Sequence, residues 1–134
     1  MNPDELLALA INSRASAYAP YSHFAVGAAL ETRSGRVFTG CNVENLSFGL
    51  TICAERSAVF AAVAAGERDF SQIVIVADSQ EPVTPCGACR QVLAEFSEDL
   101  EVRSVNLQGV EYRANLRELL PRAKAGILDT PRST

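Results

Sequence analysis

The sequence lacks the features that mark several large classes of protein. No run of apolar residues approaches the roughly 20 that a membrane-spanning helix needs. No basic patch or stripe is visible, and the formal net charge is −4, whereas polynucleotide binders normally carry clustered positive charge. We therefore expect neither a membrane protein nor a nucleic-acid binder, and the charge balance suits a small, nearly neutral ligand.

Signals for secretion and for a second domain are also missing. Met1–Glu5 has neither the positive region nor the apolar stretch of a secretory signal, so we expect a protein of the reducing cytoplasm. No linker, repeat or low-complexity stretch interrupts the chain. We expect one domain over residues 1–134, with residues 129–134 as a flexible tail.

Apolar periodicity and helix signals predict helices that alternate with strands. Asn2 and Glu5 form a capping pair around Pro3, and the apolar run Ile73–Ala77 is typical of a central strand covered on both faces. Helices are expected at 3–18, 54–65, 86–96 and 115–120, and strands at 24–31, 36–41, 73–77 and 102–107. This alternation predicts a layered α/β domain with helices on both faces of the sheet. The helix at 54–65 is so apolar after Ser57 that we expect it to be buried on most sides.

Three of the four cysteines have the spacing of ligands for one metal ion. Cys86 and Cys89 lie three residues apart and share a face at the start of a predicted helix, while Cys53 begins another helix. The positive ends of helix dipoles favour thiolates, and soft thiolate ligands select zinc over magnesium or calcium. Three protein ligands leave the fourth tetrahedral position open for water, which is typical of a catalytic zinc site.

Charged residues beside these cysteines predict the chemistry of the site. Glu55 could simply compensate the dipole of its helix, but beside a zinc site we expect it to relay protons for an activated water. Three thiolates and Zn²⁺ sum to −1, so a guanidinium that donates to a sulfur would offset this charge. Arg56 and Arg90 are candidates, and we favour Arg56 because it lies between a ligand and the core.

Two other interpretations of the cysteines remain open. Four cysteines can form two disulfides, although a chain of this size needs no such staples. Alternatively, Cys41 could close the zinc site as a fourth ligand, which would make the protein a structural or binding module. Otherwise Cys41 packs as a small apolar residue.

The motifs resemble those of the small, homotetrameric cytidine deaminases. The blocks that carry this resemblance follow in the family's order: Pro20–Leu30, Gly40–Asn45, Cys53–Arg56, Pro85–Val92 and Leu119–Pro121. Three ligands, an activated water and a glutamate that does not bind the metal are typical of zinc deaminases. The resemblance implies a three-layer α/β/α sandwich around a mixed five-stranded sheet. It also implies a homotetramer that hydrolytically deaminates free cytidine and 2′-deoxycytidine, with release of ammonia, in pyrimidine salvage.

The resemblance also implies a set of substrate contacts. The positions of Asn42 and Glu44 hold the ribose 3′-hydroxyl in this family, and residues two apart on an extended segment point the same way. Their alternative role is to stabilise the turns of a polar loop. Phe24 matches an aromatic residue that packs on the substrate, although it could also belong to the core, and the Ala54 position supplies backbone contacts to the base.

Two positions depart from the family pattern. Phe48 stands where tyrosine is frequent, and Lys124 stands where a phenylalanine usually reaches a neighbouring subunit's site, so Ile127 or Leu128 closes the site or closure differs. These departures leave an alternative substrate open, namely a modified cytidine or an aminated nucleoside antibiotic. The single histidine, His23, argues against the polynucleotide editors that resemble this pattern, because those begin it with a histidine ligand.

Overall fold

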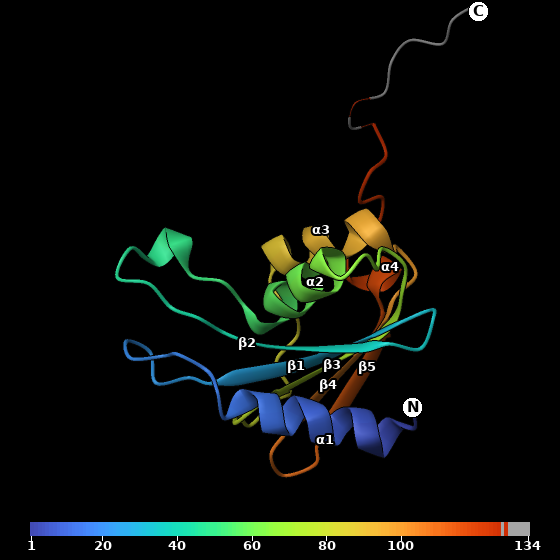
Figure 1. Cartoon of the computed structure of the whole chain (residues 1–134). Helices are drawn as coiled ribbons and strands as arrows, with labels where there is room; N and C mark the ends of the chain where they lie inside the picture. The colour runs from blue at the N-terminus through green and yellow to red at the C-terminus, as the bar shows by residue number, and fades with distance from the viewer. Residues whose placement is uncertain (127, 129–134) are drawn as a thin grey trace, which may run out of the picture.

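The computed structural model describes residues 1–126 and 128, and it has the predicted three layers. A five-stranded mixed sheet in the order β2-β1-β3-β4-β5 has α1 on one face and α2, α3 and α4 on the other (Figure 1). The helices are α1 (Pro3–Arg14), α2 (Ala54–Ala64), α3 (Gly87–Phe96) and α4 (Leu116–Leu119), with a short 3-10 turn at Phe48–Leu50. The strands are β1 (Val26–Thr32), β2 (Val37–Cys41), β3 (Phe70–Ala77), β4 (Glu101–Asn106) and β5 (Glu111–Asn115).

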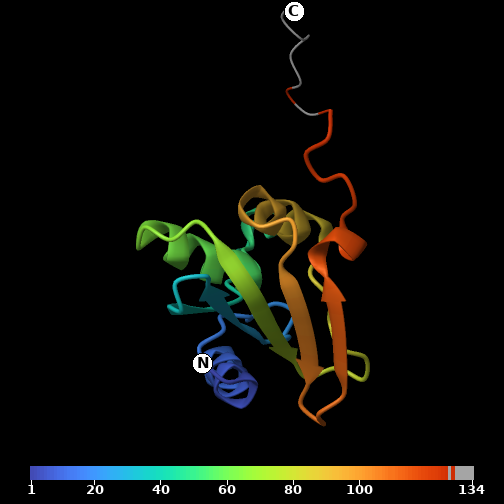
Figure 2. The same ribbon diagram turned by 90° about the vertical axis from the view of Figure 1, so that its right-hand side faces the viewer.

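The central strand β3 connects the two halves of the sheet. It pairs antiparallel with β1 and parallel with β4, and the β3–α3–β4 crossover needed for that parallel pair places α3 on one face. Ile73 and Ile75 face the core under α2 and α3, whereas Val74 and Val76 face the core under α1. The continuous apolar run therefore reflects a strand that is buried on both sides (Figure 2).

Several elements differ from the prediction, and the central strand begins at Phe70 rather than at Ile73. The first helix ends at Arg14 rather than near Tyr18, and the strand expected from Phe24 begins at Val26, so residues 15–25 form a loop. The residues alone did not predict β5, because this edge strand exposes Glu111, Tyr112 and Arg113 and has no apolar run. The short helix α4 begins after Asn115, whose side chain caps it.

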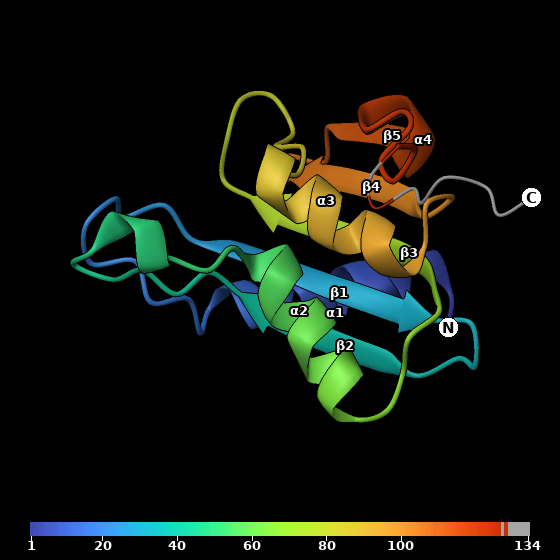
Figure 3. The ribbon, with the colours of Figure 1, turned by 90° about the horizontal axis from the view of Figure 1, so that it is seen from above.

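The helix α2 is buried on one face only, so the expectation of burial on most sides is wrong for this chain. Ala54, Ala58, Val59 and Ala62 are completely buried, but Phe60 on the other face is 49% exposed. Figure 3 shows α2 and α3 side by side over the sheet, where their inner faces share one core. Residues 1–126 and 128 provide no layer that covers the outer face of α2.

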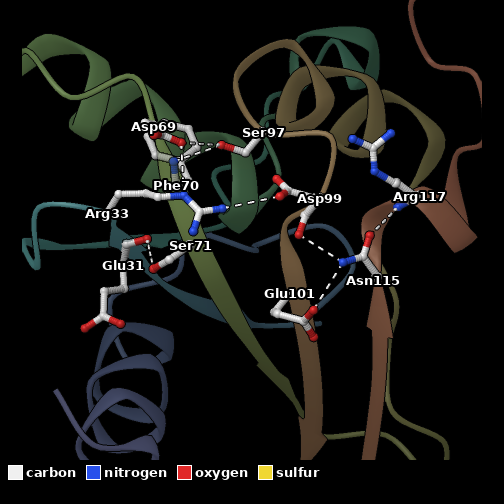
Figure 4. Close-up of polar contacts among 10 residues, drawn as sticks. All are labelled: Glu31, Arg33, Asp69, Phe70, Ser71, Ser97, Asp99, Glu101, Asn115 and Arg117. Carbon is white, nitrogen blue, oxygen red and sulfur yellow. Dashed lines mark hydrogen bonds and ion pairs between the residues drawn. The ribbon is translucent and has the colours of Figure 1, made fainter.

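Polar side chains fasten the strand ends at one end of the sheet (Figure 4). The Ser97 hydroxyl accepts a hydrogen bond of 2.8 Å from the backbone of Phe70, where β3 begins. The Asn115 amide donates to the Asp99 carbonyl at 2.9 Å, while its oxygen caps α4. These contacts satisfy backbone groups where β3, β4 and β5 meet the helical layer, and the cysteine motifs lie toward the opposite end.

No helix among residues 1–126 and 128 has the length and apolar character required to cross a membrane. The longest, α1, has 12 residues. The expected tail at 129–134 lies outside the described residues.

A close backbone approach sets the position of α2. A Cβ atom added at Gly40 on β2 would lie 2.4 Å from the Ala54 carbonyl oxygen and 2.5 Å from the Ala58 nitrogen. We therefore expect Gly40→Ala to lower the free energy of unfolding by about 1–3 kcal/mol, because the helix backbone must move away. Gly49 has open space around it, so Gly49→Ala should stay within about 0.5 kcal/mol of wild type. Equal stability of the two variants in thermal or urea unfolding would contradict this packing argument.

Candidate active site

A cavity of about 260 Å³ lies at the end of the sheet where β3 leads toward α3. Its walls come from the loop before β1, the segment after β2, the first turn of α2 and the loop before α3. The cavity brings together seven of the residues singled out in the sequence: Phe24, Asn42, Glu44, Cys53, Ala54, Glu55 and Cys86. Segments far apart in the chain therefore converge on one hollow of nucleoside size.

Three thiols lie together beside this cavity. Cys53 is the N-cap residue of α2, Cys86 is the N-cap residue of α3, and Cys89 lies in the first turn of α3. Their sulfur atoms all lie within 4.8 Å of one another. Cys53 Sγ is 3.9 Å from Cys86 Sγ, which is 3.3 Å from Cys89 Sγ. Two helix N-termini thus present three sulfurs to one point.

The sulfur cluster suits a zinc ion. Tetrahedral Zn–S bonds of about 2.3 Å place sulfurs about 3.8 Å apart, close to the observed separations. All four cysteines are free thiols, so the disulfide interpretation is wrong. Cys41 is not in the cluster, which is the sole group of three or more potential metal ligands in the described part of the chain. A structural site closed by Cys41 is therefore not supported.

Arg56 lies beside the first ligand. Its Nη2 is 3.4 Å from Cys53 Sγ and 3.4 Å from the Thr51 carbonyl oxygen. A hydrogen bond from Cys89, followed by the Arg56 guanidinium, holds the pKa of the Cys53 thiol well below its ordinary value. The same hydrogen bond raises the pKa of Cys89, because its S–H donates to the Cys53 thiolate. The Arg56 guanidinium, as a hydrogen-bond donor to Cys53, offsets part of the negative charge that three thiolates would place around a metal.

Glu55 lies in the first turn of α2, almost out of reach of solvent. It is 5% exposed, and burial raises the pKa of this carboxyl to about 7, with a further increase from the negative charge at Cys53. A carboxyl group with a pKa near neutrality can both accept and release a proton under physiological conditions. Its position against the sulfur cluster and the cavity suits proton transfer to a small ligand held there.

Asn42 and Glu44 line the cavity and also bind the chain itself. Asn42 donates to the Phe24 carbonyl at 2.7 Å and accepts from the Val26 nitrogen at 2.8 Å. Glu44 accepts from the backbone of Ser22 at 3.1 Å and from its hydroxyl. The hydroxyl contact is the main reason that the pKa of Glu44 is lowered. Each side chain keeps hydrogen-bonding capacity toward the cavity, since a carboxylate offers about four acceptor sites and an amide two donors.

The remaining predicted contacts occupy different parts of the site. Phe24 is 37% exposed at the cavity wall, and Ala54, which lines the same cavity, is fully buried. Lys124 donates to the Glu95 carbonyl at 3.1 Å, which fastens it to its own α3. Leu128 is 94% exposed and is not among the residues that line the cavity, and Ile127 lies outside the described residues.

Several wall residues were missed in the sequence. They are Ser22, Val26, Thr51, Ile75, Val83 and Thr84. Ser22 and Thr84 stood inside or beside recognised motifs, so their positions could have suggested a role. The aliphatic residues carry no such signal, because a residue that lines a pocket and one that fills the core look alike in sequence.

The geometry predicts one zinc ion per chain, bound by sulfur. Cys86→Ser should lower the zinc content of purified protein well below one equivalent, because serine is a poor zinc ligand beside two thiolates. Cys41→Ser should keep the wild-type content, since Cys41 lies outside the cluster. Elemental analysis of both variants checks this, and zinc loss in Cys41→Ser would overturn the three-ligand assignment.

Comparison with known proteins agrees with this geometry. Residues 1–103 match the family model described as the cytidine and deoxycytidylate deaminase zinc-binding region. A cytidine deaminase from Halalkalibacterium halodurans is 51% identical over 124 residues, which cover 92% of this chain and 94% of the relative. A blasticidin-S deaminase from Bacillus cereus is 30% identical, over 87% of this chain and 88% of that protein.

Solved structures lead to the same family. The crystal structure of cytidine deaminase from Burkholderia pseudomallei superimposes with a TM-score of 0.87 at 50% sequence identity, covering 90% of this chain and 98% of the other. The five-stranded mixed sheet with helices on both faces is therefore the fold of these enzymes. The chain belongs to the zinc-dependent cytidine and deoxycytidylate deaminase family.

Proposed function

We propose that the protein hydrolytically deaminates free cytidine and 2′-deoxycytidine to uridine and 2′-deoxyuridine in pyrimidine salvage. The observation that carries this proposal is the buried carboxyl of Glu55 beside three convergent thiols at a cavity of about 260 Å³. The cytidine deaminase of Halalkalibacterium halodurans, 51% identical over nearly the whole chain, supports the choice of substrate.

The chemistry assigns each group a separate task. Zinc, held by Cys53, Cys86 and Cys89, would supply the Lewis acid that makes a water nucleophilic at neutral pH. Glu55 accepts one proton of the attacking water and passes it to N3 of the base while oxygen bonds to C4. Glu55 then moves the second proton to the exocyclic amine, the C4–N4 bond breaks, and ammonia leaves. The water oxygen remains as the C4 carbonyl of uridine.

The cavity wall orients the nucleoside for this reaction. Phe24 packs against the substrate, the backbone at Ala54 meets the polar edge of the base, and Asn42 and Glu44 hold the 3′-hydroxyl. A site that binds the 3′-hydroxyl and makes no contact with the 2′-hydroxyl accepts both ribose and 2′-deoxyribose. Arg56 donates a hydrogen bond to the Cys53 sulfur and so draws negative charge away from it, which would leave the metal a stronger Lewis acid.

A nucleoside antibiotic or a modified cytidine is the alternative substrate. Two observations support this alternative. One relative is a blasticidin-S deaminase, and Phe48 stands where tyrosine is frequent in the family. Values of kcat/KM for cytidine, 2′-deoxycytidine and blasticidin S decide between these substrates. A value for blasticidin S above that for cytidine would reverse the assignment.

We infer that the enzyme works in the cytoplasm, where a reducing environment preserves its free thiols. Cell fractionation tests this, and recovery of the protein from the medium would contradict it.

Removal of the proton relay should abolish turnover without loss of metal. Glu55→Gln keeps the size and polarity of the side chain but cannot carry the proton, so kcat should fall by about 10²–10⁴-fold. Zinc content should remain that of wild type, because Glu55 is not a ligand. Ultraviolet loss of cytidine measures the rate, and a kcat within tenfold of wild type would defeat the proposed role.

The role of Glu44 can be separated from its bonds to the loop at Ser22. Glu44→Gln should raise KM for cytidine and 2′-deoxycytidine by about tenfold, as expected for loss of a charged hydrogen bond. With 3′-deoxycytidine, which lacks the hydroxyl in question, wild type and variant should have the same KM. An equal loss with all three nucleosides would mean that Glu44 acts through the loop instead.

We propose a homotetramer as the working form. The loop over residues 42–53 projects beyond the sheet together with the loop at 15–25, and it exposes Leu46, Phe48 and Leu50 by 79%, 73% and 65% (Figure 1). Clustered exposed apolar side chains of this kind indicate a protein–protein contact. Light scattering during size-exclusion chromatography should give about four times the chain mass of 14.4 kDa. A monomeric mass would refute the assembly.

A further inference from the structure

Arg90 is a half-buried arginine whose three hydrogen bonds all go to neutral oxygens. From the second turn of α3 its Nε donates to the Pro85 carbonyl at 2.7 Å, and its Nη1 donates to the Leu119 carbonyl at 2.9 Å. Its Nη2 donates to Thr84 Oγ1 at 3.3 Å. None of the ion pairs formed by residues 1–126 and 128 involves this guanidinium. Its contacts therefore hold backbone in place rather than balance charge.

The segment that Arg90 holds is a wall of the active site. Residues 78–86 connect β3 to α3 without regular structure, so no helix or strand ladder fixes their path. Val83, Thr84 and Cys86 line the cavity, and Pro85 is buried between them. Cys86 is also the exposed member of the sulfur cluster. A shift of this segment would move a metal ligand and a wall of the cavity together.

The contact of Arg90 with Leu119 reaches a different part of the chain. Leu119 is the last residue of α4, and its carbonyl is among the helix-end acceptors that no further helical turn can satisfy. The planar fork of the guanidinium sends its donors to this carbonyl and to the Thr84–Pro85 segment simultaneously. Arg90 thereby connects the end of α4 to the loop that carries Cys86.

We propose that Arg90 is a positioning residue that holds the Thr84–Cys86 segment against the end of α4, and so keeps Cys86 and the adjoining cavity wall in place. It neither lines the cavity nor hydrogen-bonds to a sulfur of the cluster, and it acts through the segment that it holds. The kinetic side of this inference rests on the proposed deaminase activity, whereas its effect on zinc retention does not.

Arg90→Lys is the direct test, because lysine keeps the charge but offers a single ammonium in place of a fork. We expect transfer of zinc to a coloured chelator to become about tenfold faster, as is typical when a contact that orients a metal ligand is lost. KM for cytidine should rise about fivefold. This factor should be larger than the factor by which kcat falls. Wild-type rates of zinc release and a wild-type KM would overturn the proposal.

Gln91→Ala is the matched control. Gln91 neighbours Arg90 on α3 and also binds the C-terminal segment, through a 3.3 Å hydrogen bond to the Ala123 carbonyl, but it makes no hydrogen bond to the loop before Cys86. Zinc release and KM should stay within about twofold of wild type. An effect equal to that of Arg90→Lys would mean that general loosening of this segment, not Arg90, sets the site.

A second pair of variants keeps the inference testable if Arg90→Lys does not fold. Thr84→Ser keeps the hydroxyl that accepts from Arg90, whereas Thr84→Val keeps the shape and removes it. Zinc release should match wild type in the serine variant and be about threefold faster in the valine variant. Equal rates in both would overturn the proposal. If wild-type protein fails to deaminate cytidine while these zinc-release differences persist, the proposed function fails and the positioning role stands.

Discussion

The whole site depends on two helices that must begin within reach of one metal ion. α2 and α3 lie side by side on the same sheet face, and their N-cap cysteines bring sulfurs to 3.9 Å. That spacing exists because Gly40 lets α2 approach β2 closely, while a crossover connection places α3 beside it. Helix N-termini also favour the thiolate form that a metal requires.

Burial sets the pKa of the Glu55 carboxyl. The turn that positions Cys53 also carries Glu55 into a nearly dry environment, which raises the pKa of Glu55 to about 7. Three bare thiolates this close together would repel one another, and the Arg56 guanidinium beside Cys53 offsets part of that cost. The proposed metal ligand, proton relay and charge-compensating residue thus lie within four consecutive positions, Cys53 to Arg56, because the start of one helix can present them in different directions.

Features that depend on residues close together in the chain could be predicted from the sequence. Cys53, Glu55 and Arg56 were recognisable because their chemistry depends on local spacing, and the buried run at Ile73 indicated a central strand. The edge strand β5 was not apparent from the residues, because its side chains are polar and exposed and only its pairing with β4 makes it a strand. The contacts of Arg90 join segments far apart in the chain, so no local pattern reveals them.

X-ray absorption at the zinc edge of the purified, substrate-free protein tests the central claim most directly. Three sulfur neighbours at about 2.3 Å and one oxygen at about 2.0 Å are predicted, since three thiolates leave one position for an exchangeable water. A shell of four sulfurs, or protein that holds no zinc at all, would contradict an open catalytic centre in this fold.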